Sequence, residues 1–201
     1  TTRDLGFSGA LINGTTNGAY LDDDRFSVLW ERASDLDVPI YIHPNNPADT
    51  PAMYQGHSEM WGPVWSWTVE TGSHALRILF SGVFDRYPNA KLILGHMGET
   101  LPYQLWRFDS RWKISNRGSK KLELAPSEYF KRNFWCTTAG VCSDEPMRCA
   151  IDALGVERVM FSVDYPFERS EETGEWIETA QLSNSERSLV CYENAKSLLK
   201  L

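Results

Sequence analysis

The chain has 201 residues, of which 42% are hydrophobic, 23% charged and 12% aromatic, as in a globular protein with one sizeable core. Its formal net charge of -7 argues against a nucleic-acid partner. The sequence contains no apolar run long enough to cross a bilayer and no secretory signal, so we expect no membrane partner and no secretion.

The cysteines indicate neither a disulfide framework nor a zinc ribbon. Cys136, Cys142, Cys149 and Cys191 contain no C-x-x-C pair among them. We therefore expect reduced thiols in a cytoplasmic protein.

Apolar strands alternate with helices along the chain. Strands are predicted at residues 7–13, 38–44, 91–96, 133–140 and 158–164. Helices are predicted at residues 23–37, 65–84, 145–154 and 185–199, with a Pro- and Trp-rich loop at 44–63 and an irregular helical region before the fourth strand. This order predicts a parallel sheet, and the continuous apolar strands agree with burial on both faces.

Two α/β architectures fit this order: a doubly wound sheet and part of a (β/α)8 barrel. The sequence has no G-x-G-x-x-G or G-x-x-x-x-G-K-[ST] motif, which disfavours a nucleotide-binding sheet. Five strands cannot close an eight-stranded barrel, so a barrel would need further βα units. The opening "TTRDLGFSG" is typical of a helix end running into a strand, so we expect the interior of a longer protein.

Three predicted strands end on a group that can bind a metal or move a proton: His43, His96 and Asp164. Such strand ends converge at one mouth of a barrel, where active sites lie. A single histidine after a strand is more often structural, but three suitable groups together favour a functional site. Imidazole and carboxylate suit Zn²⁺, Mn²⁺ or another divalent ion.

Other polar residues allow two interpretations each. Glu99 could orient or protonate His96, or it could cap the following helix. His74 lies among apolar residues and is predicted to be structural, whereas His57 has weak support as a residue at the mouth. Buried hydroxyls explain Thr138 and Ser162 as well as a functional role does.

Four segments resemble one known family: "GALINGTTNG", "VPIYIHPNNP", "LILGHMGETLPYQLWRFD" and "MFSVDYPFE". They are similar to the amidohydrolase-2 branch of the amidohydrolase superfamily. Within it, they most resemble the nonoxidative decarboxylases of γ-resorcylate (2,6-dihydroxybenzoate) and 2,3-dihydroxybenzoate. The resemblance implies that residues 1–201 are one partial domain: the C-terminal five βα units of a TIM-type barrel, with the first three units absent.

The resemblance also implies roles at the strand ends. His43 and Asp164 correspond to metal ligands, and His96 paired with Glu99 belongs to the proton-handling apparatus. The family's E-x-H pair at the first strand, which supplies further ligands, has no counterpart in this sequence. We therefore expect residues 1–201 alone to hold metal poorly and to fold poorly. Inactivity of the chain by itself would agree with this expectation.

Substrate contacts and the reaction follow from the same resemblance. Arg107 matches an arginine that contacts the substrate carboxylate, in some relatives across a subunit interface, and Phe167 matches an aromatic residue against the substrate ring. The implied reaction is decarboxylation of a hydroxylated benzoate with one divalent ion, Zn²⁺ or Mn²⁺ ahead of Mg²⁺, in a homodimer or homotetramer. Asp164 or His96 would deliver the proton, and relatives favour the aspartate. The alternatives are a metal-dependent lactone or amide hydrolase and a noncatalytic truncated partner subunit.

Overall fold

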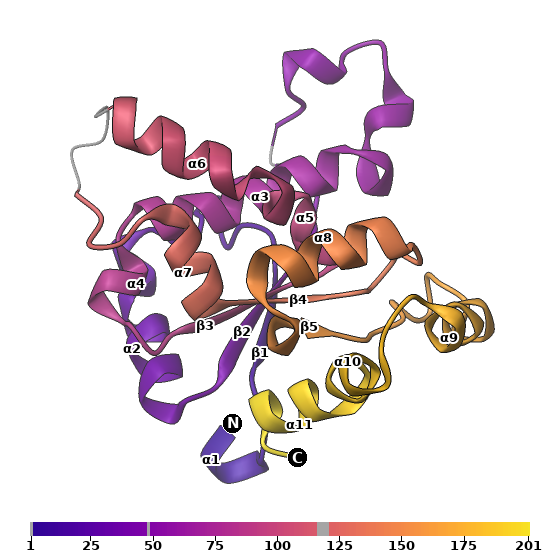
Figure 1. The fold of residues 1–201 in the computed structure, drawn as a ribbon. Coiled ribbons are helices and arrows are strands. Elements are labelled where there is room, and N and C mark those ends of the chain that lie inside the picture. The colour runs from indigo at the N-terminus through magenta and orange to yellow at the C-terminus, as the bar shows by residue number, and fades with distance from the viewer. Residues whose placement is uncertain (1, 48, 116–120) are drawn as a thin grey trace.

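A five-stranded parallel sheet forms the centre of the molecule in the computed structural model, which describes residues 2–47, 49–115 and 121–201 (Figure 1). Its strands are β1 (Ala10–Asn13), β2 (Pro39–His43), β3 (Lys91–Leu94), β4 (Phe134–Thr137) and β5 (Val159–Met160). They lie in sequence order, and each adjacent pair is parallel. The predicted parallel α/β arrangement is confirmed.

Helices surround the sheet, and residues 49–63 project beyond the body at the top of Figure 1. The helices are α1 (Thr2–Leu5), α2 (Ser27–Leu36), α3 (Ser66–Phe80), α4 (Val83–Arg86), α5 (His96–Glu99), α6 (Leu101–Ser115), α7 (Pro126–Asn133), α8 (Asp144–Leu154), α9 (Ser170–Thr179), α10 (Asn184–Ser188) and α11 (Asn194–Leu199). Among the described residues, none of these helices combines the length and apolar character that a membrane crossing requires.

The helices differ from the predicted ones in several places, beginning with α2, which is preceded by a 3-10 turn at Asp24–Phe26. The helix predicted at 65–84 breaks at Gly82, whose φ of 77° is left-handed. The one predicted at 185–199 consists of α10, a π-helical turn at Leu189–Glu193, and α11. Helix α9 was not predicted, because its sequence "SEETGEWIET" carries few apolar positions.

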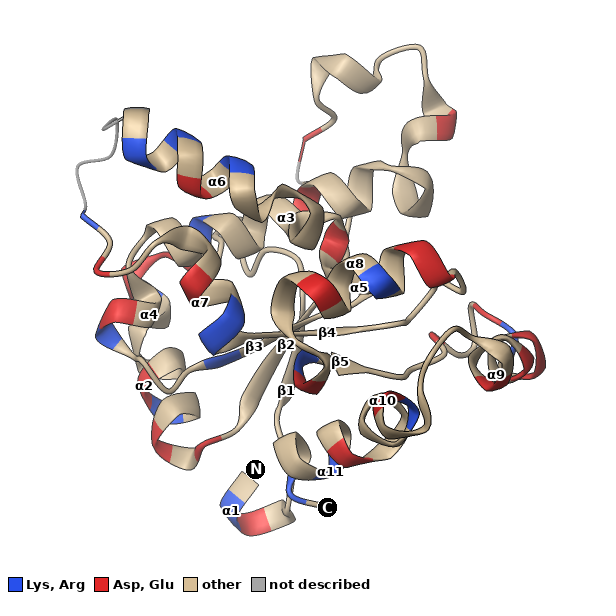
Figure 2. Ribbon diagram, viewed as in Figure 1, with Lys and Arg blue, Asp and Glu red and all other residues tan. Residues whose placement is uncertain are grey.

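The strands bury both of their faces. Side chains on one face of the sheet, among them Ile40, Ile42 and Leu92, belong to the main hydrophobic core. The intervening residues Ile93 and Met160 form a second cluster with Leu198 of α11. Charged side chains lie mostly on outer helices and loops, and those of α9 are all acidic, whereas Lys91 is the one Lys, Arg, Asp or Glu within these five strands (Figure 2). All four cysteines are free thiols, as predicted.

Strand β5 is much shorter than predicted. The apolar run from Val159 to Val163 led us to expect a strand up to Asp164, but regular pairing with β4 ends at Met160. Beyond it, the Phe161 amide donates to the carbonyl of Val190, so the chain turns away from β4 toward the C-terminal helices. Hydrophobicity alone does not reveal this change of hydrogen-bond partner.

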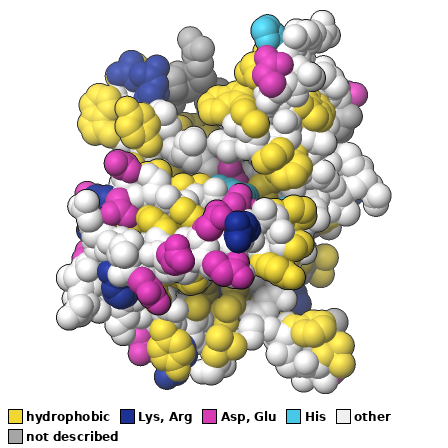
Figure 3. All heavy atoms as spheres, turned by 90° about the vertical axis from the view of Figure 1, so that its right-hand side faces the viewer, with side chains coloured by type: hydrophobic (Ala, Val, Ile, Leu, Met, Phe, Trp, Pro, Cys, Tyr) yellow, Lys and Arg dark blue, Asp and Glu magenta, His cyan; other side chains and the backbone are white. Residues whose placement is uncertain are grey.

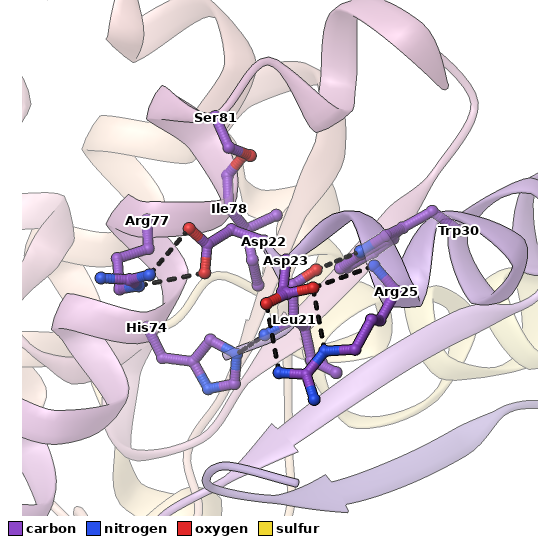
Figure 4. A network of polar contacts seen from close by, with 9 residues as sticks. All are labelled: Leu21, Asp22, Asp23, Arg25, Trp30, His74, Arg77, Ile78 and Ser81. Carbon is purple, nitrogen blue, oxygen red and sulfur yellow. Dashed lines mark hydrogen bonds and ion pairs between the residues drawn. The ribbon is translucent and has the colours of Figure 1, made fainter. Parts of the chain in front are cut away.

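A polar network fastens the loop after β1 to α3 (Figure 4). His74 is fully buried, and its Nε2 accepts the Leu21 amide at 2.9 Å, in agreement with its predicted structural role. Arg77, one helical turn further along, donates two hydrogen bonds of 3.0 Å to the carboxylate of Asp22. The Tyr20 hydroxyl donates to the carboxylate of Glu70 on the same helix.

Candidate active site

A cavity of about 1040 Å³ opens where the strands end. His43 ends β2, His96 follows β3, Gly140 follows β4 and Asp164 follows β5, and all four line this cavity. Parallel strands bring their carboxyl ends to one edge of a sheet, which accounts for this convergence. On the face seen in Figure 3, histidine and acidic side chains reach the surface between groups of hydrophobic side chains.

The segment "HMGET" after β3 forms a left-handed turn. All five residues from His96 to Thr100 have positive φ, between 48° and 77°, although only one of them is glycine. Each non-glycine residue in this conformation costs roughly 1–2 kcal/mol. Strain of this kind persists only where the surroundings enforce it, which is typical of functional sites.

The left-handed turn brings the His96 and Glu99 side chains together. His96 Nδ1 lies 2.7 Å from Glu99 Oε1, and Glu99 is only 1% exposed. The carboxylate therefore contacts the ring, and among the described residues it makes no hydrogen bond that would cap a helix. Burial by itself lowers the pKa of His96, but the hydrogen bond to Glu99 and the charges of Glu99 and Asp164 outweigh burial and raise it. Glu99 Oε2 is buried without a hydrogen-bond partner among the described residues.

Asp164 faces the opposite side of the same imidazole. Its Oδ2 lies 3.6 Å from His96 Nε2, and both side chains are about a quarter exposed. Asp164 has a φ of 79°, so this carboxylate also stands on a left-handed residue. Gly140 passes close to both groups: a Cβ there would lie 2.9 Å from His96 Cδ2 and 3.4 Å from Asp164 Oδ2.

The imidazole of His43 is hydrogen-bonded on one side to the adjoining residue. Its Nδ1 lies 2.9 Å from the carbonyl of Pro44, and a donated hydrogen bond there leaves the Nε2 lone pair free. Together with the carboxylate of Asp164 it offers nitrogen and oxygen donors that suit a divalent ion. Within the described ranges, no three His, Cys, Asp or Glu side chains group closely enough to form a metal site. The residues thus fit part of a metal shell.

Three further predicted residues lie in different places. Phe167 lines the cavity but is 77% exposed. Arg107 is exposed on α6 and is not among the described residues that line the cavity. His57 lies outside the lining as well, paired with Glu59 on the exposed loop, in agreement with its weak support as a residue at the mouth.

Tyr41 does not line the cavity, but it lies close enough to Glu99 and Asp164 for their charges to act on it, and no prediction was made for it from the sequence. The Tyr41 hydroxyl lies 3.2 Å from Thr137 Oγ1, passing over Gly95, where a Cβ would approach it to 2.8 Å. Burial raises the pKa of Tyr41 to about 12, and the hydrogen bond to Thr137 partly opposes this rise. The available signal was the spacing: Tyr41 lies two residues before His43 and so shares its side of the strand.

The chain belongs to the amidohydrolase family. Residues 2–201 match the model of the family described as amidohydrolase, which is almost the whole chain. Membership agrees with the parallel sheet and with acidic and histidine side chains at its strand ends.

Individual relatives narrow the comparison. The chain is 40% identical to a γ-resorcylate decarboxylase from Polaromonas sp., over 99% of this chain and 64% of that protein. A dihydroxybenzoic acid decarboxylase structure from the same genus, with bound manganese and the inhibitor 2-nitroresorcinol, superposes with a TM-score of 0.93 at 40% identity. That match covers 100% of this chain and 63% of the other. A 5-carboxyvanillate decarboxylase structure from Sphingomonas paucimobilis gives a TM-score of 0.93 at 36% identity. That match covers 98% of this chain and 60% of the other. The chain thus spans about 64% of the curated relative's length.

Proposed function

We propose that the protein to which these residues belong is a metal-dependent, nonoxidative decarboxylase of a hydroxylated benzoate such as γ-resorcylate, releasing CO₂ and a phenol. The observation that carries the proposal is the convergence of His43, His96, Glu99 and Asp164 on one cavity. The similarity to decarboxylases of this type supports the substrate class.

His43 Nε2 and the carboxylate of Asp164 would hold one divalent ion, with Mn²⁺ supported by the manganese in the Polaromonas structure. The bound ion would supply Lewis acidity and a template for the substrate's carboxylate and ortho-hydroxyl oxygens. Phe167 would pack against the aromatic ring from the cavity wall. Glu99 accepts a hydrogen bond from His96 Nδ1 and thereby directs Nε2 toward Asp164.

A proton held by the His96–Asp164 pair would go to the ring carbon that bears the carboxylate. Protonation forms a carbon–hydrogen bond and interrupts aromaticity. Breaking the carbon–carbon bond then releases CO₂ and returns its electron pair to the ring, which becomes aromatic again. Glu99, buried beside His96, stabilises the imidazolium form through this cycle.

The test is product analysis with full-length protein loaded with Mn²⁺ and supplied with 2,6-dihydroxybenzoate. We expect CO₂ and resorcinol, and an activity loss of about 10²-fold or more in Asp164→Asn and His96→Asn. His57→Asn is the matched control, because His57 is exposed and outside the cavity lining. A ring-opened acid from a lactone substrate would instead indicate a hydrolase, and no turnover of either would favour a noncatalytic partner subunit.

We further propose that the chain comprises the C-terminal five βα units of an eight-stranded barrel and forms one partial domain. Support comes from the open sheet, whose outer strands β1 and β5 each pair with a single neighbour among the described strands. Leu11 on β1 is 59% exposed, as expected for a residue that another strand or helix would cover. An intact mass well above 22.9 kDa for the protein from its own source would agree with this, and a matching mass would contradict it.

The assembly we propose is a homodimer or homotetramer in which a second copy covers one face of α6. Tyr103, Trp106 and Ile114 recur at helical spacing on this face and are strongly exposed. Arg107 lies beside Trp106, so a neighbouring active site could receive its guanidinium for a substrate carboxylate.

A further inference from the structure

Thr138, directly after β4, is hydrogen-bonded through its side chain to the segment that leads to Asp164. Thr138 is fully buried, and its Oγ1 donates a hydrogen bond of 2.7 Å to the carbonyl of Ser162. The same oxygen accepts the Ser162 amide at 2.9 Å. One hydroxyl thus satisfies both backbone groups of a residue that lies two positions before Asp164.

The Thr138 side chain supplies the hydrogen bonds between the two strands beyond the point where backbone pairing ends. Backbone pairing of the two strands ends as the Thr138 amide donates to the Met160 carbonyl at 3.0 Å. The Thr138 carbonyl is occupied by the Val141 amide at 2.9 Å, which closes the turn after β4. Ser162 would therefore have no backbone partner on β4, and the hydroxyl takes that place.

The contact connects the two loops that meet at His96. Gly140 lies two residues after Thr138, and Asp164 lies two residues after Ser162. Both of these residues border the His96 ring: a Cβ at Gly140 would lie 2.9 Å from His96 Cδ2, and Asp164 Oδ2 lies 3.6 Å from His96 Nε2. Asp164 also has a left-handed φ of 79°, a conformation that is kept only if the neighbouring residues are fixed.

We propose that Thr138 is a positioning residue for Asp164. Its hydroxyl sets the path of residues 161–164 and so directs the Asp164 carboxylate toward the divalent ion that His43 would share. This inference rests on the proposed function. Partners of this kind behind a metal ligand typically change metal affinity by about 10- to 100-fold when removed.

The experiment is calorimetric titration of Mn²⁺ into metal-free full-length protein, with thermal unfolding of the same metal-free samples. We expect Thr138→Val, which keeps the shape and loses the hydroxyl, to bind Mn²⁺ about 10- to 100-fold more weakly. Thr138→Ser retains the hydroxyl and is expected to bind as the wild type does. Thr173→Val is the matched control, because Thr173 is a buried threonine of α9 whose hydroxyl donates to the Arg169 carbonyl outside the cavity.

Each outcome separates this inference from the proposed function. If the wild type binds no Mn²⁺, the proposed function fails first. If the wild type binds and Thr138→Val binds equally well, or if Thr138→Ser does not restore binding, the positioning role is overturned. If Thr138→Val does not fold, Thr138→Ala repeats the test. Failure of both to fold would assign the hydroxyl to folding and would also overturn the proposal.

Discussion

Gly140 leaves the space in which His96 and Asp164 approach each other. It has a φ of 65°, and the nearest atoms to a Cβ built there belong to those two side chains. Both the backbone conformation and the close contact therefore require glycine at this position.

We predict that Gly140→Ala strongly reduces the proposed decarboxylation and modestly reduces stability. The methyl group would lie 2.9 Å from His96 Cδ2, so the ring must move, and displacements near 1 Å at a reacting group cost about 100-fold in rate. An alanine in the left-handed conformation is also expected to lower the free energy of unfolding by roughly 1–2 kcal/mol. Steady-state kinetics and urea unfolding of full-length protein measure the two effects.

Gly174→Ala in α9 is the matched control for this substitution. Apart from its chain neighbours and the backbone of its own helix, no described residue has an atom within 4 Å of a Cβ at Gly174, and alanine is favoured over glycine in a helix by up to about 1 kcal/mol. Its activity should equal that of the wild type, with equal or higher stability. A wild-type rate in Gly140→Ala would contradict the tight placement of His96 and Asp164.

At this scale the sequence predicted the residues that end strands but not those that shape the space between them. His43, His96 and Asp164 follow apolar runs and were predicted from that position. Gly140 and the left-handed turn at residues 96–100 left no comparable conformational signal, because a glycine in a loop and a pentapeptide with a single glycine occur in many backbone conformations. The catalytic and metal-binding roles assigned to these residues stay predictions.

At the scale of elements, the attachment of the loop after β1 to α3 depends on a neutral imidazole. His74 Nε2 accepts the Leu21 amide, which a protonated ring cannot do. Burial lowers the pKa of His74 from 6.5 to about 4, with Asp22 opposing and Arg77 reinforcing the shift. Tyr20 packs edge-on against the same ring.

This arrangement predicts a loss of stability as the pH falls from about 6.5 to about 4. In that window the unfolded chain binds a proton at His74 and the folded chain does not, so acid favours unfolding. The contribution is complete above pH 6.5 and falls by at most about 1.4 kcal/mol per pH unit, about 3 kcal/mol in all. Urea unfolding at a series of pH values measures it.

The variant that isolates this effect is His74→Gln, which cannot titrate. We expect it to be less stable at neutral pH but to lose less stability on acidification than the wild type does. His57→Gln is the control, because His57 is exposed, and its pH dependence should run parallel to that of the wild type. Parallel curves for all three proteins would contradict the assignment to His74.

Strand β5 marks the limit of what the sequence predicted about elements. The order of strands and helices followed from apolar periodicity, and the strands at 91–96 and 38–44 agree with β3 and β2 within a few residues. The end of β5 did not follow, because it depends on the Val190 carbonyl and the Thr138 hydroxyl, both distant in sequence. Long-range hydrogen bonds of this kind have no local pattern.

For the molecule as a whole, the apolar face of α6 stands out because its large side chains are exposed to solvent in the single chain. Tyr103 is 79% and Trp106 76% exposed, and Tyr103 also lines the cavity. A face of this kind beside a binding cavity is typical of a surface that another protein covers. Its continuity with the cavity favours an assembly in which subunit contact and active site adjoin.

We predict that Trp106→Glu reduces the oligomer to a smaller species. A buried tryptophan at an interface commonly contributes about 2 kcal/mol or more, so its loss would raise the dissociation constant by about 30-fold, and the introduced carboxylate adds repulsion from a desolvated charge. Light scattering after size exclusion across a dilution series of full-length protein measures the change. Tyr192→Glu is the control, since Tyr192 is an aromatic residue with 56% exposure outside α6. A wild type that is already monomeric, or an oligomer unchanged in Trp106→Glu, would rule out α6 as the interface, and Arg107 would then act within its own subunit or not at all.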